Sequence, residues 1–433
     1  MRFLVGAIIG LLALAAFSNA RLFRATLKEP SIYRKDFLNH YVVGRATLVG
    51  VNPYAEIGDL AKTLIGPQVT GVFPHPSPYP PPNVLLLAPF GALRYKVAVV
   101  AWHVLQFASL LFVALLLLSE FKFRRKLLKI LAVGALAFAW DAVAEDFFWG
   151  NSMLVLLAPL TLAWVCLRRE KDGAGGALLG IVIALKVIAW PLLLLLAFRK
   201  NLKAVVAAGV VIIVANIASV LAIGFDPAVY YYSTVPGIVA PLYRARRDNF
   251  SIFGIAWRLF EGTGSPIFDT LRVAPLFYAP QIASVAAIVL PLLALSVALY
   301  FTLQTRSFDL QFALMLCACV VLGPLAWKAY LVWLALPLAV LIWQLRTASR
   351  RLRWLALLVA VLLFGYPTPL SLLAAPFMKK DESVAPFAVS LVTFIPLLAV
   401  MGLFGLLFLT RVQTESATYL SERTVRSESA GTG

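Results

Sequence analysis

The chain has 433 residues, of which 61% are hydrophobic and only 13% are charged, and its formal net charge is +18. Soluble domains are about half apolar and about a quarter charged, so this composition excludes an ordinary soluble domain and indicates a helical membrane protein. Basic loops between membrane spans account for the positive charge. Because motifs of nucleic-acid-binding folds are absent from the sequence, we expect no nucleic-acid partner.

The first apolar segment, residues 3–19, predicts a membrane span, and a signal peptide is the alternative reading of the first twenty residues. In both cases residues 20–82 follow as a long loop on the outer side. The basic loops that flank the later apolar segments support this orientation, because short cytoplasmic loops are rich in lysine and arginine.

A polar stretch, "RKDFLNHYVVGRATLVGVNPY", opens this outer loop. It predicts a helix from Tyr33 to about Leu48, capped by Gly50 and stopped by Pro53. Asp36, Asn39, His40 and Val43 share one face of this helix, whereas Phe37, Tyr41, Arg45 and Leu48 share the other.

The second face is apolar apart from Arg45, which is typical of a helix that lies in the membrane interface. Asp36 is then either an ordinary interfacial carboxylate or a catalytic base. His40 is either a second group of the site or a solvated helix residue.

Six prolines between Phe73 and Pro82 predict a stiff, extended segment, followed by a short helix from Asn83 to about Leu93. His75 and Tyr79 either line a substrate groove or belong to a rigid loop. Spacing alone leaves both interpretations open.

Residues 174–198 lie between two basic clusters, "RREKD" and "RKNLK". A single span would place one cluster on the outer side. We therefore predict a hairpin of two short helices with Lys186 at its outer tip and Pro191 at the start of the returning helix. Such half-length helices are tolerated where they pack inside protein or line a cavity.

The remaining apolar segments complete about ten to twelve membrane helices in an all-α, multi-span protein. We expect one transmembrane domain at 1–410, whose outer loops 20–82 and 225–280 form the site, and a disordered cytoplasmic tail at 411–433. Both termini are expected to be cytoplasmic. The other spans are predicted at 97–118, 127–140, 152–167, 205–224, 282–304, 309–323, 328–345, 354–373 and 387–410.

This topology places the polar residues between the spans at one membrane face. A transport pathway would instead place ionisable groups near the midplane, so the pattern favours an enzyme that acts on a lipid-linked substrate over a transporter or flippase. The acidic turn "DAVAED", with Asp141, Glu145 and Asp146, does not specify a metal site, because three carboxylates alone do not define an oxygen-ligand set, and we expect no metal. The residues gathered at this face are Asp36, His40, Arg45, Asp141, Glu145, Asp146, Lys186, Arg244, Arg246, Arg247, Asp248 and Lys328.

Several motifs, in order between residues 36 and 345, resemble glycosyltransferase family 87, which comprises polyprenol-phosphate-mannose-dependent mannosyltransferases of the GT-C fold. The segments that carry the resemblance are "DFLNHYVVGRATLVGVNPY", "YPPPNVLLLAPFGAL", "WGNSMLVLLAPLTLAWVCL", "GGALLGIVIALKVIAWPLLLLLAFRK", "DNFSIFGIAWRLF" and "LGPLAWKAY". The chain departs from the family at Gly323-Pro324, where Ser-Pro is frequent, and at Lys328, where a histidine is frequent.

The resemblance assigns Asp36 to the aspartate that is the presumed base of GT-C enzymes, and Lys186 to the family's span lysine. It implies substrate-binding positions at Asn52, Tyr54, Asn151, Asn249 and Trp327, where Asn151 stands in place of a frequent glutamine.

The topology and the family resemblance together predict a plasma-membrane glycosyltransferase with its active site on the outer face. It would move a hexose, expected to be mannose, with inversion from a polyprenyl phosphate to a lipid or glycan acceptor, without a cofactor. Asp36 would take the proton of the acceptor hydroxyl, and basic residues would bind the phosphate. Candidate substrate-binding residues are His40, Arg45, Asn52, Tyr54, Tyr79, Asn151, Lys186, Arg244, Arg246, Arg247, Asn249, Trp327 and Lys328. A transporter or flippase and a non-catalytic scaffold remain as alternatives.

Overall fold

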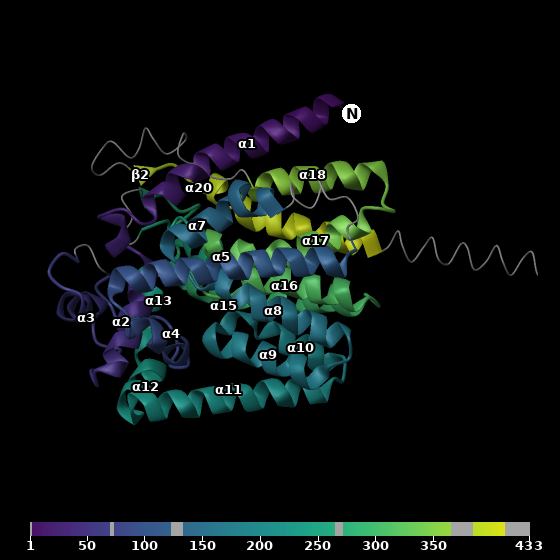
Figure 1. Ribbon diagram of the computed structural model, residues 1–433. Coiled ribbons are helices and arrows are strands. Elements are labelled where there is room, and N and C mark those ends of the chain that lie inside the picture. The colour runs from purple at the N-terminus through teal and green to yellow at the C-terminus, as the bar shows by residue number, and fades with distance from the viewer. Residues whose placement is uncertain (1, 70–72, 123–132, 265–271, 365–383, 412–433) are drawn as a thin grey trace, which may run out of the picture.

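The computed structural model describes residues 2–69, 73–122, 133–264, 272–364 and 384–411 (Figure 1). The sequence-based predictions for the tail at 411–433 and for the second half of the span at 354–373 lie almost wholly outside these residues. The described chain is built almost entirely from helices, and the expected all-α class is confirmed. Its two short strands, β1 (Arg272–Val273) and β2 (Val384–Ala385), pair in parallel.

Most of the longer helices run side by side through the body of the molecule, and most of the shorter helices gather at one of its ends (Figure 1). The helices of the body are α1 (Arg2–Ala25), α5 (Tyr95–Glu120), α8 (Met153–Arg168), α9 (Asp172–Leu185), α10 (Pro191–Phe198), α11 (Leu202–Ile223), α15 (Pro280–Leu303), α16 (Phe308–Leu322), α17 (Ala335–Gln344) and α18 (Arg350–Phe364). The shorter helices are α2 (Asp36–Leu48), α3 (Ile57–Leu64), α4 (Asn83–Gly91), α7 (Asp141–Trp149), α12 (Phe225–Ser233), α13 (Val235–Tyr243), α14 (Ile252–Phe260) and α20 (Ala388–Thr393).

Three described helices, α5, α11 and α15, are long and apolar enough to cross a membrane. A fourth span results if α7 and α8, which meet at an angle of 120°, are counted together. The acidic turn expected before α8 is thus the helix α7. Further apolar helices, including α16 and Ile395–Arg411, are shorter than a full span. The membrane class is confirmed, whereas length alone supports fewer complete spans than the expected ten to twelve, because several apolar segments are short or broken.

The predicted hairpin at 174–198 is confirmed. Lys186 interrupts the chain between α9 and a 3-10 turn at Val187–Ala189, and Pro191 is the first residue of α10. The Asn201 side chain, just after α10, donates a 2.7 Å hydrogen bond to Asp172 at the start of α9. The start of α9 and the end of α10 therefore lie close together, and Lys186 lies at the opposite end of the hairpin, at its tip.

The body has a basic end where several helix termini meet. Arg168, near the end of α8, pairs with Glu120 of α5 at 3.2 Å and with Asp309 of α16 at 3.2 Å. Arg199, after α10, donates to Gln311 of α16. The opposite termini of α8, α9 and α16 therefore lie at the other end, where the shorter helices gather.

The polar module forms α2, which begins at Asp36 and is preceded by a 3-10 turn at Ser31–Tyr33. The expectation that its apolar face lies against the membrane is wrong. Phe37 is fully buried against Trp102 of α5, and Tyr41 is 3% exposed. The apolar face packs on protein because α4 and α5 close over it.

Glycine permits the close crossing of α2 and α4. A Cβ atom at Gly44 would lie 2.4 Å from the backbone oxygen of Leu87. Gly50 ends α2 with a positive φ of 72°, as the predicted glycine cap requires. The contact at Gly44 holds the second half of α2 against α4, and Phe37 against Trp102 holds its first turn, and with it Asp36, against α5.

Candidate active site

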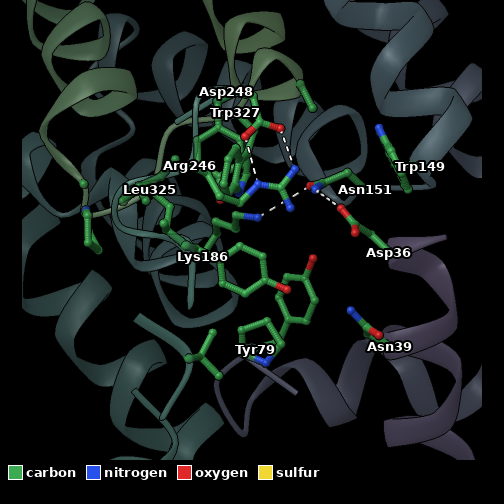
Figure 2. Close-up of a pocket in the computed structure, with 18 of the residues that line it drawn as sticks. Asp36, Asn39, Tyr79, Trp149, Asn151, Lys186, Arg246, Asp248, Leu325 and Trp327 are labelled. Carbon is green, nitrogen blue, oxygen red and sulfur yellow. Dashed lines mark hydrogen bonds and ion pairs between the residues drawn. The ribbon is translucent and has the colours of Figure 1, made fainter. Parts of the chain in front are cut away.

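A cavity of about 830 Å³ opens among α2, the proline-rich segment, the break between α7 and α8, and the tip of the α9–α10 hairpin. Figure 2 shows Asp36, Tyr79, Asn151, Lys186, Arg246 and Trp327 around it. Its size is within the range of small-molecule and cofactor sites. The cavity joins segments that are more than two hundred residues apart in the sequence.

Asp36 is the first residue of α2, so its carboxylate lies at the positive end of the helix. Its Oδ2 accepts a 2.9 Å hydrogen bond from Asn151 Nδ2. Burial raises the pKa of the Asp36 carboxyl above its ordinary value, while the Asn151 hydrogen bond and the charge of Lys186 oppose that rise. A carboxylate with a raised pKa is suited to accept a proton near neutral pH.

Lys186 is 93% buried and has neutral neighbours. Its Nζ lies 5.2 Å from the ring centroid of Tyr79 and 4.6 Å from that of Tyr330, and 3.5 Å from Asn151 Oδ1. Asn151 therefore links the lysine to Asp36 through the two ends of one amide. Asn83 holds the tip of the hairpin in place, because its Nδ2 donates a 2.8 Å hydrogen bond to the carbonyl of Leu185.

The other expected basic residues separate into two groups. Arg246 and Arg247 line the cavity, and Arg246 forms two hydrogen bonds of 2.9 and 2.8 Å with Asp248. Lys328 also lines it, but its Nζ pairs with Asp141 at 2.7 Å and with Glu145 at 3.2 Å. Arg244 lies outside the cavity lining.

Arg244 is instead occupied by neighbours within the second outer loop. It pairs with Glu261 at 3.2 Å, and its guanidinium lies 3.8 Å from the ring centroid of Trp257. The expected phosphate contact of Arg244 has no support in this geometry.

His40 and Arg45 also lie outside the cavity lining. His40 is fully buried, with its ring centroid 4.1 Å from that of Tyr79, so it supports the tyrosine from behind. This burial excludes the solvated reading of His40 and lowers its pKa to about 3. Arg45 donates a 3.2 Å hydrogen bond to the Gly91 carbonyl and thereby joins α2 to α4.

Asn52 and Tyr54 line a second, smaller cavity that borders the first at His75. The Tyr54 hydroxyl donates a 2.9 Å hydrogen bond to the Tyr79 carbonyl. His75 Nδ1 donates to the Pro76 carbonyl, so its Nε2 accepts from the Tyr243 hydroxyl at 2.6 Å. The aromatic contacts thus order the proline-rich segment along the main cavity.

Asn249 and Trp327 take different positions. Asn249 is fully buried and bridges two segments. Its Nδ2 donates a 3.1 Å hydrogen bond to the Pro324 carbonyl, and its Oδ1 accepts a 2.9 Å hydrogen bond from the Ala326 amide. It therefore shapes the loop that carries Trp327, which lines the cavity and lies beside Arg246.

Further residues line the cavity that the sequence did not place among the site residues. Trp149, Tyr243 and Tyr330 come from three separate segments, and no spacing in the sequence relates them. Asp248, which was expected at the polar face but not as a substrate-binding residue, also lines the cavity. Asn39 also lines the cavity; its position on the Asp36 face of the helix was the available signal. In the part of the chain that the structure describes, His, Cys, Asp and Glu form no cluster of three that would hold a metal ion.

The fold and the cavity define a multi-pass membrane protein in which the carboxylate of Asp36 lies in one cavity with a buried lysine, Lys186. The chain belongs to glycosyltransferase family 87, whose model matches residues 78–327. This match includes Asn151, Lys186 and Trp327, whereas Asp36 precedes it. No solved structure matches the chain.

Three curated mycobacterial proteins illustrate the relationship. An α-(1→3)-arabinofuranosyltransferase of Mycobacterium tuberculosis is 32% identical over 176 residues, or 40% of this chain and 39% of that protein. The arabinofuranosyltransferase of Mycolicibacterium smegmatis is 27% identical over 254 residues, or 55% of this chain and 57% of that protein. A polyprenol-phosphate-mannose-dependent α-(1-2)-phosphatidylinositol mannoside mannosyltransferase of M. smegmatis is 25% identical over 357 residues, which are 79% of this chain and 77% of that protein.

Proposed function

We propose that the chain is a membrane glycosyltransferase that moves a sugar from a polyprenyl-phosphate donor to a lipid or glycan acceptor. The observation that carries this proposal is the line Lys186, Asn151 and Asp36 in one cavity. Such an arrangement offers a positive charge to a phosphate and a carboxylate to a hydroxyl, a short distance apart. Membership in glycosyltransferase family 87 supports the same reaction class.

In the proposed reaction an acceptor hydroxyl attacks the anomeric carbon while Asp36 takes its proton. A carbon–oxygen bond forms to the acceptor, and the bond from the anomeric carbon to the phosphate oxygen breaks, with inversion. The leaving group is already an anionic lipid phosphate, so positive charge assists its departure more than a general acid would. Lys186 and Arg246 are the cavity residues that we assign to this role.

The proposed orientation places the cavity at the outer face of the plasma membrane, with the N-terminus cytoplasmic. The loops that contain Arg168 and Arg199 lie at the opposite end of the body from the cavity. Short basic loops are characteristic of the cytoplasmic side. A lipid donor that enters from the membrane would then present its phosphate and sugar at headgroup depth.

The identity of the sugar divides the relatives, because two are named for arabinofuranose and one for mannose. The motifs of the sequence favour mannose, and the mannosyltransferase match covers the larger share of the chain. We therefore propose mannose and retain arabinofuranose as the competing donor sugar. Parallel assays with the two polyprenyl-phosphate sugars distinguish them.

The test uses purified protein, each radiolabelled polyprenyl-phosphate sugar, and a lipid extract as acceptor. Wild-type protein should transfer label to the extract, and Asp36→Asn should reduce the rate by about 10²–10⁴, the usual contribution of a general base. Transfer that is equal with Asp36→Asn contradicts the proposed base. Movement of intact donor across a vesicle bilayer without transfer supports the flippase alternative.

A further inference from the structure

Asn39 lines the cavity, and its amide oxygen has no hydrogen-bond partner among the residues that the structure describes. It is 4% exposed and lines the cavity one helical turn after Asp36. Within the described parts of the chain, its buried Oδ1 has no hydrogen-bond donor. Burying an amide oxygen without a donor costs free energy, so such a side chain in a cavity indicates a partner that the protein itself does not supply.

The geometry relates this amide to the reacting groups. Residues three apart on a helix have Cβ atoms about 5–6 Å apart and lie on the same face. Figure 2 shows Asn39 below Asp36 on the same side of the cavity, with its amide nitrogen toward the cavity and Lys186 across from both. Asp36 and Asn39 therefore lie together on the α2 side of the cavity, and Lys186 lies on the other side.

This arrangement divides the substrates between the two sides of the cavity. If Lys186 binds the donor phosphate and Asp36 takes the proton of the attacking hydroxyl, Asn39 lies beside that hydroxyl, one turn along α2 on the acceptor's side. An amide both donates and accepts hydrogen bonds, as a hydroxyl does. The amide nitrogen of Asn39, which Figure 2 shows toward the cavity, can donate to the oxygen of such a hydroxyl.

We infer that Asn39 is a specificity-determining residue that binds an acceptor hydroxyl adjacent to the one that attacks. The acceptor is then a glycoside with two neighbouring free hydroxyls, one on Asp36 and one on Asn39. This inference rests on the proposed function. It adds the chemical class of the acceptor and a residue that reads it.

The test is a double-mutant cycle in which one change is made in the enzyme, at Asn39, and the other in the acceptor, at a single hydroxyl. The probes are octyl α-mannopyranoside and octyl α-arabinofuranoside, each with its set of monodeoxy analogues. With wild type, replacement of the hydroxyl adjacent to the new linkage by hydrogen should reduce kcat/KM about tenfold, the effect of one hydrogen bond of ordinary strength. Asn39→Ala should reduce kcat/KM for the parent glycoside about tenfold.

The two changes should not add when they are combined. Asn39→Ala should use the parent and that deoxy analogue equally well, which is the mark of a direct interaction in such a cycle. Asn39→Leu, close in volume but without hydrogen bonds, should behave like Asn39→Ala. Asn216→Ala, a remote amide on α11, should retain the full discrimination of wild type.

Other outcomes overturn the inference. Losses that multiply to about a hundredfold would show that Asn39 does not touch that hydroxyl, and coupling to a deoxy position on the donor sugar would assign it to the donor. If wild type glycosylates neither octyl glycoside but still modifies the lipid extract in an Asp36-dependent way, the acceptor class is wrong while the proposed function stands. Unchanged thermal unfolding of the Asn39 variants is the control for folding.

Discussion

The hydrogen bond from Asn151 to Asp36 sets the basicity of the proposed catalytic carboxylate, and Asn151→Ala tests this. The amide nitrogen donates to Oδ2 at 2.9 Å and favours the charged form of the carboxyl. Without it the pKa of Asp36, already raised by burial, should rise further. A hydrogen bond to a charged group contributes about 1.5–3 kcal/mol. At about 1.36 kcal/mol per factor of ten, kcat/KM at low pH should fall by about tenfold to a hundredfold.

The assay is the pH dependence of kcat/KM for sugar transfer, which reports the free enzyme. Asp36 must be deprotonated to act as a base, so activity rises with pH through its pKa. This rise is the acidic limb of the pH profile, and a higher pKa of Asp36 moves it to higher pH. Asn151→Ala should therefore be most impaired at low pH, and its activity should recover in part at pH values above the shifted limb.

The control for Asn151→Ala is Asn216→Ala. Asn216 makes comparable side-chain hydrogen bonds on α11, to the Ile212 carbonyl and the Tyr232 hydroxyl, but lies outside the cavity lining. It should leave the acidic limb where it is in wild type. A limb that stays in place with Asn151→Ala, or that moves to lower pH, would refute the assignment of that limb to Asp36 and the role given to the amide.

Two further predictions concern stability, measured by thermal unfolding in detergent. Lys328→Met leaves two largely buried carboxylates without their cation and should destabilise the fold by about 3–5 kcal/mol, whereas Lys96→Met, at an exposed ion pair, should change little. Gly44→Ala places a Cβ atom 2.4 Å from a backbone oxygen of α4 and should cost about 1–3 kcal/mol; Gly209→Ala, where a Cβ atom meets nothing within 4 Å, should not destabilise. Equal melting temperatures within either pair would contradict the packing described.

The hairpin was predictable because its signals are local. Two basic clusters flank one apolar run, Lys186 lies at its middle, and Pro191 follows within the same segment. Charge asymmetry and the missing backbone donor of proline act over a few residues, so neither depends on distant parts of the chain. The position of Asp36 just after an apolar run was local information of the same kind.

The partners of the arginines could not be predicted in this way. Arg244 and Arg246 are two residues apart and equally charged, yet one pairs with Glu261 outside the cavity lining and the other with Asp248 at the cavity. Which carboxylate each meets depends on how α13 and α14 pack. The apolar face of α2 was misread for a related reason: an apolar face fits lipid and protein equally well, and Phe37 meets α5 only in the folded chain.

The two lysines of the cavity differ in how much of their positive charge is left for a substrate. Lys328 is held by two carboxylates, which offset its positive charge. Lys186 is surrounded by two tyrosine rings and an amide, and in the described chain no carboxylate lies within ion-pair distance of it. Neutral neighbours orient an ammonium group without cancelling its charge, and in an enclosed site that charge attracts an anion more strongly than it would in water. The donor phosphate is therefore expected at Lys186, which leaves Asp36, across the Asn151 amide, to face the acceptor.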